Sequence, residues 1–283
     1  MKKTIKKIYN TIFEFVGRVT NDHIAAYAAM SSFFFVLAMI PIILLLLTIV
    51  RFTPITKADT MTAVMTVFPD SVTSLITSIV NQVYNQSMSI IPITIIVALW
   101  SAGKGVLAIN SGLNVVYRCR ETRNYFYLRI RSTIYTLMFI LMIIVMLVLS
   151  VFGDSLAVWV NGRFPFLIPI TNVIMSWRTV FTVAVMFVFM TLVYKYMPNR
   201  KSRMKREYIG SIFSIVYWMV LSYIFSVYLD IFTGFSTMYG SMATLILIMM
   251  WLYFGMYGIL MGSEINQMLE DHRQAKKSEE KSS

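Results

Sequence analysis

Residues 24–50 read IAAYAAMSSFFFVLAMIPIILLLLTIV and contain no charged side chain. A bilayer core about 30 Å thick needs about 20 apolar residues in a helix that rises about 1.5 Å per residue. This run is long enough to cross a membrane, and similar apolar runs follow it. The predicted spans are residues 24–50, 90–116, 132–152, 173–196, 208–229 and 240–262. The pattern predicts an all-α fold, a polytopic membrane bundle of six transmembrane helices in one membrane domain, residues 1–268.

The composition indicates a membrane protein rather than a soluble domain. Of the 283 residues, 58% are hydrophobic and only 13% are charged, and the mean hydropathy is +0.70. A net charge of +12 would suit a nucleic-acid partner if the basic residues shared one face, but they fall in short clusters between the apolar runs. No specific nucleic-acid partner is therefore expected. The single cysteine, Cys119, cannot form an internal disulfide.

The connections between the spans predict the orientation, because cytoplasmic loops retain lysine and arginine. With the N-terminus inside, all but four of the 25 lysine and arginine residues lie on the cytoplasmic side. The four exceptions are Arg51, Lys57, Arg163 and Arg178. Both termini are therefore expected in the cytoplasm, and the N-terminus lacks the features of a cleavable signal.

Three segments outside the spans have patterns of their own. Before residue 24, apolar residues recur at helical spacing behind four lysines, which predicts an amphipathic helix on the anionic inner leaflet. It is either a topology anchor or a specific binder of lipid headgroups. Residues 70–86 predict a second amphipathic helix, in the loop on the extracellular side, that lies across the outer ends of the bundle or covers a cavity. The charged tail, residues 269–283, predicts a disordered cytoplasmic end.

The sequence contains no recognisable catalytic constellation. Its two histidines, His23 and His272, are not accompanied by paired metal-ligand spacing. There is no G-x-S-x-G element, and the stretch around Gly103-Lys104-Gly105 does not fit a phosphate-binding loop. We therefore expect no enzyme activity, no cofactor and no metal site.

Polar residues at membrane depth are the best candidates for function, because an ionisable group there is costly. Lys104 lies about 21 Å along the second span from its outer end at about 1.5 Å per residue. Asn110 and Asn114 follow on one helical face, and Glu264 and Asn266 end the last span. One interpretation is a polar cleft in which Lys104 faces Glu264 along a substrate or lipid pathway. The other is structural, with Lys104 extending to the headgroups and the asparagines joining helices.

Several stretches together resemble the YihY/BrkB family of bacterial inner-membrane proteins, formerly labelled ribonuclease BN. They are AAYAAMSSFFFVLAMIPIILLLL, LWSAGKGVLAINSGLNVVYRCRE, YKYMPNRKSRMKREYIGSIF and YGSMATLILIMMWLYFGMYGILMGSEINQ. The resemblance implies six helices in the bacterial plasma membrane with cytoplasmic termini. It also implies a link to the export of lipid or lipopolysaccharide precursors, which is the role connected genetically with some members.

These observations lead to three functional hypotheses. The first is a permease-like protein that assists the movement of a lipid-like or anionic amphipathic substrate, with membrane lipids and anionic inner-leaflet headgroups as partners. The second is a membrane scaffold that recruits a cytoplasmic partner through the basic loops YRCRETRNYFYLRIR and NRKSRMKRE. The third and least favoured is a ribonuclease or another hydrolase.

Overall fold

The computed structural model describes residues 2–51, 56–67, 77–78, 80–81, 84, 91–150, 153–231 and 241–282. None of the described residues forms a β-strand, so the predicted all-α class is confirmed. The α-helices are α1 (Lys2–Asn21), α2 (Ile24–Arg51), α3 (Lys57–Val67), α5 (Ile91–Val116), α6 (Tyr125–Ser150), α7 (Gly153–Arg163), α8 (Ile168–Ser176), α9 (Arg178–Tyr196), α10 (Tyr208–Ile231) and α12 (Ser241–Ser282). Two short 3₁₀ turns, Pro165–Leu167 and Met204–Arg206, lie between them.

The described helices confirm a polytopic bundle with five or six spans. Five stretches are long and apolar enough to cross a membrane: Ile95–Val116, Tyr125–Met146, Arg178–Tyr196, Tyr208–Tyr228 and Leu245–Glu280. The sixth arises if Tyr9–Asn21 and Ile24–Met39, which are bent by 53° relative to each other, form one span. The bend occurs at His23, whose φ of 50° lies in the left-handed region that ends one helix before the next begins.

Two predicted spans differ from the helices at their ends. The third was expected from residue 132, but α6 already begins at Tyr125, because its arginines lie at the end of the bundle and do not interrupt the helix. The fourth was expected over residues 173–196, but Trp177, with φ −106° and ψ 13°, separates α8 from α9. Most of the helix predicted over residues 70–86 lies outside the described residues.

The C-terminal segment also differs from the expectation, since α12 continues through the tail that composition suggested would be disordered. The tail contains three Glu and three Lys together with one Gln and one Ala, all of which favour helices. Side-chain bonds one turn apart support it: Gln267 donates to Asp271 at 2.8 Å and Gln274 donates to Glu270 at 3.2 Å. Residues 269–282 therefore extend the last span as a helix.

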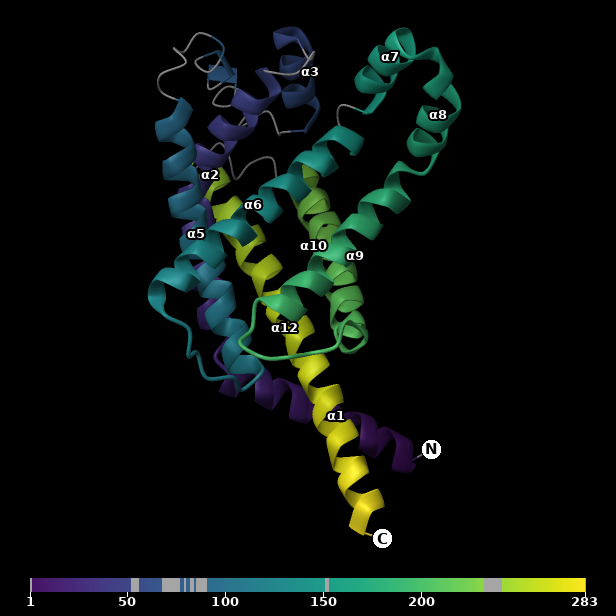
Figure 1. The fold of residues 1–283 in the computed structure, drawn as a ribbon. Coiled ribbons are helices and arrows are strands. Elements are labelled where there is room, and N and C mark those ends of the chain that lie inside the picture. The colour runs from purple at the N-terminus through teal and green to yellow at the C-terminus, as the bar shows by residue number, and fades with distance from the viewer. Residues whose placement is uncertain are drawn as a thin grey trace.

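The two termini lie at the same end of the bundle (Figure 1). The connections 117–124 and 197–207 lie at this end too, whereas α3, α7 and α8 lie at the opposite end. Because these connections and α1 contain most of the lysines and arginines, this end is termed the basic end.

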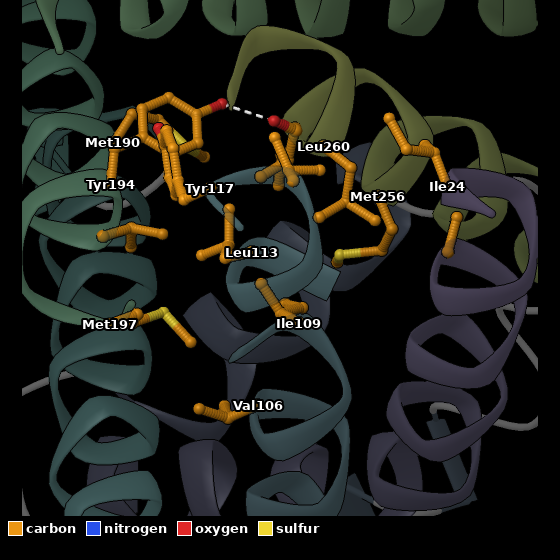
Figure 2. Close-up of a cluster of buried hydrophobic side chains, with 14 of the residues drawn as sticks. Ile24, Val106, Ile109, Leu113, Tyr117, Met190, Tyr194, Met197, Met256 and Leu260 are labelled. Atoms are coloured by element: carbon orange, nitrogen blue, oxygen red, sulfur yellow. Dashed lines mark hydrogen bonds between the residues drawn. The ribbon is translucent and has the colours of Figure 1, made fainter. Parts of the chain in front are cut away.

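Small residues bring α2 and α5 close together in the centre of the bundle. Ala28, Ser31 and Ser32 on α2 are buried, and a Cβ added at Gly112 on α5 would lie 2.9 Å from Cβ of Tyr27. Such small residues allow helix backbones to approach in a membrane, where burial of apolar surface gives little driving force. The side chains of the larger apolar residues of α5, α9 and α12 meet in the adjoining core (Figure 2).

The last two helices, α10 and α12, pack even more closely. A Cβ at Gly210 of α10 would lie 2.1 Å from the carbonyl oxygen of Gly262 on α12, so only a glycine fits there. The buried hydroxyl of Tyr194 on α9 donates to the carbonyl of Ile259 at 2.6 Å and lies 2.5 Å from the hydroxyl of Ser214. α9, α10 and α12 are therefore joined by polar contacts near the basic end.

Candidate functional site: a buried polar network beside an apolar cavity

The predicted asparagine pair of α5 converges on one carboxylate. Asn110 and Asn114 donate to Glu121 at 3.3 and 2.8 Å, and Arg123 forms an ion pair with the same carboxylate at 2.7 Å. The backbone N–H of Asn199 donates to the side-chain oxygen of Asn114 at 2.8 Å. The asparagines therefore attach the connection 117–124 to α5 and to the connection 197–207.

The surroundings of Glu121 favour its charged form. Its side-chain hydrogen bonds with Arg123 are the largest effect and lower the pKa of the carboxyl group to about 2. Burial opposes them as the second-largest effect, and the bonds from Asn114 and Asn110 lower the pKa further. Glu121 therefore carries a negative charge at neutral pH, and it balances Arg123 rather than Lys104.

A second carboxylate, Glu207, lies at the start of α10 and, unlike the partly exposed Glu121, is completely inaccessible to solvent. It accepts hydrogen bonds from Arg200 at 2.6 Å, from the hydroxyl of Tyr117 at 3.1 Å and from the side-chain amide of Asn266 at 3.1 Å. Ser202 donates to it as well. A buried charge is tolerated when it is paired and fully hydrogen-bonded, and Glu207 meets both conditions.

Arg200 connects this carboxylate to the aromatic core. Its guanidinium carbon lies 3.4 Å from the centre of the Tyr117 ring, which is a close cation–π contact. A long bond of 3.5 Å leads from Arg200 to Gln267 on α12. Through Arg200, Glu207 and Asn266, the connection 197–207 is joined to Tyr117, directly after α5, and to α10 and α12.

Glu264 occupies a third position, next to α1. Its side chain is 1% exposed, and a nitrogen of Arg18 lies 3.6 Å from it. Arg18 donates to Asp271 at 2.6 Å and also pairs with Glu14. Neither carboxylate oxygen of Glu264 has a hydrogen-bond donor among the described residues. The charged groups that face Glu264 are therefore Arg18 of the N-terminal helix, Asp22 directly after that helix, and Arg118.

Lys104 lies apart from all three carboxylates. Its side chain is exposed, and its ammonium group is 5.7 Å from the centre of the Phe34 ring. Among the described residues it forms no ion pair with Glu264, so the two groups predicted to face each other across a polar cleft are not in direct contact. The reason is helix rotation: α5 turns its asparagines inward and Lys104 outward, and Arg18 occupies the position opposite Glu264.

An apolar cavity of about 650 Å³ lies among α2, α5, α6, α9, α10 and α12. Eight of the residues that line it are methionines, and none of the described residues around it is charged. Methionine is flexible and polarisable, so such a wall adapts to apolar groups of different shapes. Lys104 and the two asparagines do not line this cavity.

The cavity adjoins the polar network at two residues of its wall. Tyr135 lines the cavity, accepts a hydrogen bond from Arg131 at 2.8 Å and donates to the carbonyl of Tyr196 at 2.8 Å. Met197 also lines it, and its carbonyl accepts from Arg123 at 3.2 Å. The basic end of the apolar cavity is therefore bordered by two arginines.

Sequence reasoning missed the two carboxylates that organise the network, Glu121 and Glu207. Each is the lone acidic residue of a basic stretch, Glu121 within 117–131 and Glu207 within 199–207. A single carboxylate among many cations is favoured as the ion-pair partner of a neighbouring arginine. This pattern is a signal that could have found both residues.

The long apolar helices, the buried polar layer and the inner cavity define a polytopic helical membrane protein. The family model described as virulence factor BrkB matches residues 15–283. The chain therefore belongs to this family, as its resemblance predicted.

Curated relatives differ in how much of the chain they match. The putative ribonuclease-like protein YfkH of Bacillus subtilis (strain 168) is 29% identical over 265 residues, which cover 92% of this chain and 95% of that protein. A UPF0761 membrane protein of Idiomarina loihiensis is 26% identical over 87 residues, 31% of each chain. One of Pasteurella multocida is 29% identical over 82 residues, which cover 29% of this chain and 26% of that protein. No solved structure gives a significant match.

Proposed function

We propose that this protein binds a lipid-like, anionic amphipathic molecule within its bundle and assists its movement across the plasma membrane. One observation carries this proposal: the apolar, methionine-rich cavity ends next to Arg123 and Arg131. Ligand pockets commonly have volumes of about 300–1,000 Å³, and the cavity of about 650 Å³ falls in this range.

The two parts of the site match the two parts of such a molecule. A hydrocarbon chain in the cavity would contact its methionines and phenylalanines and would meet no charged side chain of the protein. An anionic group would lie at the arginine border, where guanidinium groups suit phosphate or carboxylate. In this proposal Asn110 and Asn114 support the border indirectly, because they hold Glu121 against Arg123, while Asn266 holds Glu207 against Arg200 in the adjoining network.

The orientation is part of the same proposal. We place the basic end, with both termini, on the cytoplasmic side, because lysines and arginines are retained there. A reporter that fluoresces only in the cytoplasm, fused after Ser283, should give signal, and a periplasmic phosphatase reporter at the same position should be inactive. The opposite result would reverse the orientation.

Reconstitution tests the transport proposal. The full chain in proteoliposomes should accelerate the exchange between leaflets of a fluorescent phosphatidylglycerol, followed by chemical quenching from outside. Met142→Trp should slow the exchange, because Met142 lines the cavity and a larger side chain fills it. The matched control is Leu141→Trp, the neighbouring residue on α6, which is 60% exposed and points away from the cavity.

If the folded protein accelerates no exchange, or if both variants slow it equally, the proposal is wrong. A scaffold that recruits a partner through exposed basic residues such as Arg120, Lys201 and Arg203 would then be favoured. The ribonuclease-like name belongs to the Bacillus subtilis relative. RNA cleavage by the purified chain that disappears on a single substitution would support the enzyme hypothesis instead.

A further inference from the structure

One outward face of α5 changes from apolar to polar along its length. Four exposed residues, between 45% and 65% accessible, mark the apolar part: Ile93, Ile96, Val97 and Trp100. Their spacing of three or four residues places them on one face. The exposed Lys104 follows one turn later, and the exposed Ser111 lies seven residues beyond it on the same face. This face has the polarity of a phospholipid, with its polar part toward the basic end.

Two cationic side chains lie at the level of α5 where its outward face changes from apolar to polar. The guanidinium carbon of Arg129 on α6 lies 3.9 Å from the centre of the Trp100 ring, and Arg129 donates to the carbonyl of Trp100 at 2.8 Å. Lys104, one turn beyond Trp100, lies against the ring of Phe34 at 5.7 Å. Residues one turn apart on a helix have Cβ atoms about 5–6 Å apart, and a Cβ added at Gly103 would lie 3.6 Å from a guanidinium nitrogen of Arg129. The guanidinium group of Arg129 therefore lies beside the part of α5 that carries Lys104.

No protein carboxylate neutralises these cations within the described part of the chain, where neither Lys104 nor Arg129 forms an ion pair. The aromatic rings attract their charges but do not balance them. A cation within a membrane segment is costly, so it is normally paired or lies near the headgroups. Arg129 uses one of its donors on Trp100, and the guanidinium group has five, which suit a phosphate.

We propose that Lys104 and Arg129 together bind the phosphate of an anionic phospholipid whose acyl chains lie along Ile93, Ile96, Val97 and Trp100. This site is outside the methionine-rich cavity and requires no lipid movement, so it goes beyond the proposed function. A phospholipid is favoured over free phosphate because the apolar stripe leads directly to the cationic pair. Phe33 and Leu37 on α2, which are 48% and 55% exposed, provide further apolar surface.

Native mass spectrometry of the full chain released from detergent micelles tests this site, with phosphatidylglycerol as the added lipid. A lysine or arginine near an anionic membrane surface contributes about 1 kcal/mol, so Lys104→Gln should weaken the binding of the first lipid about fivefold. Arg129→Gln should have a similar effect. Because one phosphate bridges both groups, the double variant should lose clearly less than the product of the two single effects.

Matched measurements decide the outcome. Lys201→Gln removes an equal charge from an exposed position in the connection 197–207 and should leave binding of the first lipid unchanged. Arg129→Lys keeps the charge and should retain binding better than Arg129→Gln, which covers the case in which Arg129→Gln folds poorly. Met142→Trp, which tests the cavity, should not change binding at this site.

Three results would overturn the proposal. The first is unchanged lipid binding in Lys104→Gln, and the second is fully multiplicative effects of the two substitutions, since both exclude a shared phosphate. The third is binding of inorganic phosphate as tight as that of phosphatidylglycerol, which would show that the acyl chains contribute nothing. None of these results depends on whether the protein moves lipid.

Discussion

The side-chain oxygen of Asn266, on α12, accepts a 2.7 Å hydrogen bond from the backbone N–H of Gly210, in the first turn of α10. The first N–H groups of a helix have no partner within it, so Asn266 satisfies one of them from a neighbouring helix. Its amide nitrogen donates to the carboxylate of Glu207 at 3.1 Å. One side chain therefore connects the start of α10 to the buried ion pair of Glu207 and Arg200.

Asn266→Ala should destabilise the protein by about 1–3 kcal/mol, because it leaves a buried N–H and a buried carboxylate each without one partner. The free energy of unfolding can be measured in mixed micelles as SDS replaces a mild detergent. Gln274→Ala, at an exposed position on the same helix, is the control and should change it little. Equal stability of Asn266→Ala and wild type would contradict this role.

The close packing of α10 on α12 gives a second prediction. Gly210→Ala should cost about 1–3 kcal/mol or more, as overpacking does, because the new Cβ would meet the carbonyl oxygen of Gly262. Gly162→Ala in α7 is the control, since a Cβ there meets nothing within 4 Å. Alanine favours helix over glycine by about 1 kcal/mol, so the control should be neutral or slightly stabilising. The same unfolding titration reports both, and similar losses at the two positions would argue against the packing.

The spans could be predicted from the sequence because each is a long apolar run bounded by charges. The ends of the runs were less certain, since a helix does not stop where its hydropathy falls. α6 begins at Tyr125, before its two arginines, and α12 continues far past its apolar part. In both cases the polar residues are good helix formers that lie beyond the bundle core.

The arrangement of the site was harder to predict. Helical spacing correctly placed Asn110 and Asn114 together, but it does not fix the rotation of a helix against its neighbours. The asparagines therefore meet Glu121 from the next connection, and Glu264 meets Arg18 from a helix more than two hundred residues earlier. Such long-range pairs depend on packing and have no local signature.

The buried ion pair of Glu207 and Arg200 gives a third prediction. Removing one partner of a buried pair typically costs about 3–5 kcal/mol, because the other charge remains buried. Glu207→Gln should therefore destabilise strongly, since Glu207 is inaccessible and the side chain of Arg200 is 17% exposed. Asp154→Asn breaks a pair with Arg178 whose side chains are 85% and 46% exposed, and exposed pairs contribute less than about 1 kcal/mol. Thermal melting in detergent should separate the two variants clearly, and comparable shifts would show that Glu207 is not a structural centre.

Acid should weaken the protein partly through Glu121. The folded-state pKa of this carboxyl is about 2, below its ordinary value of 4.5, so the unfolded chain binds more protons in acid. The stabilisation is fully present above pH 4.5 and is lost as the pH falls toward 2.

Glu121→Gln cannot titrate and should be less stable than wild type at neutral pH, because Arg123 loses its partner. Melting temperatures of both proteins, measured from neutral pH downward, should converge below pH 4.5. A difference that stays constant over this range would show that the charge of Glu121 does not hold the connection 117–124 against α5.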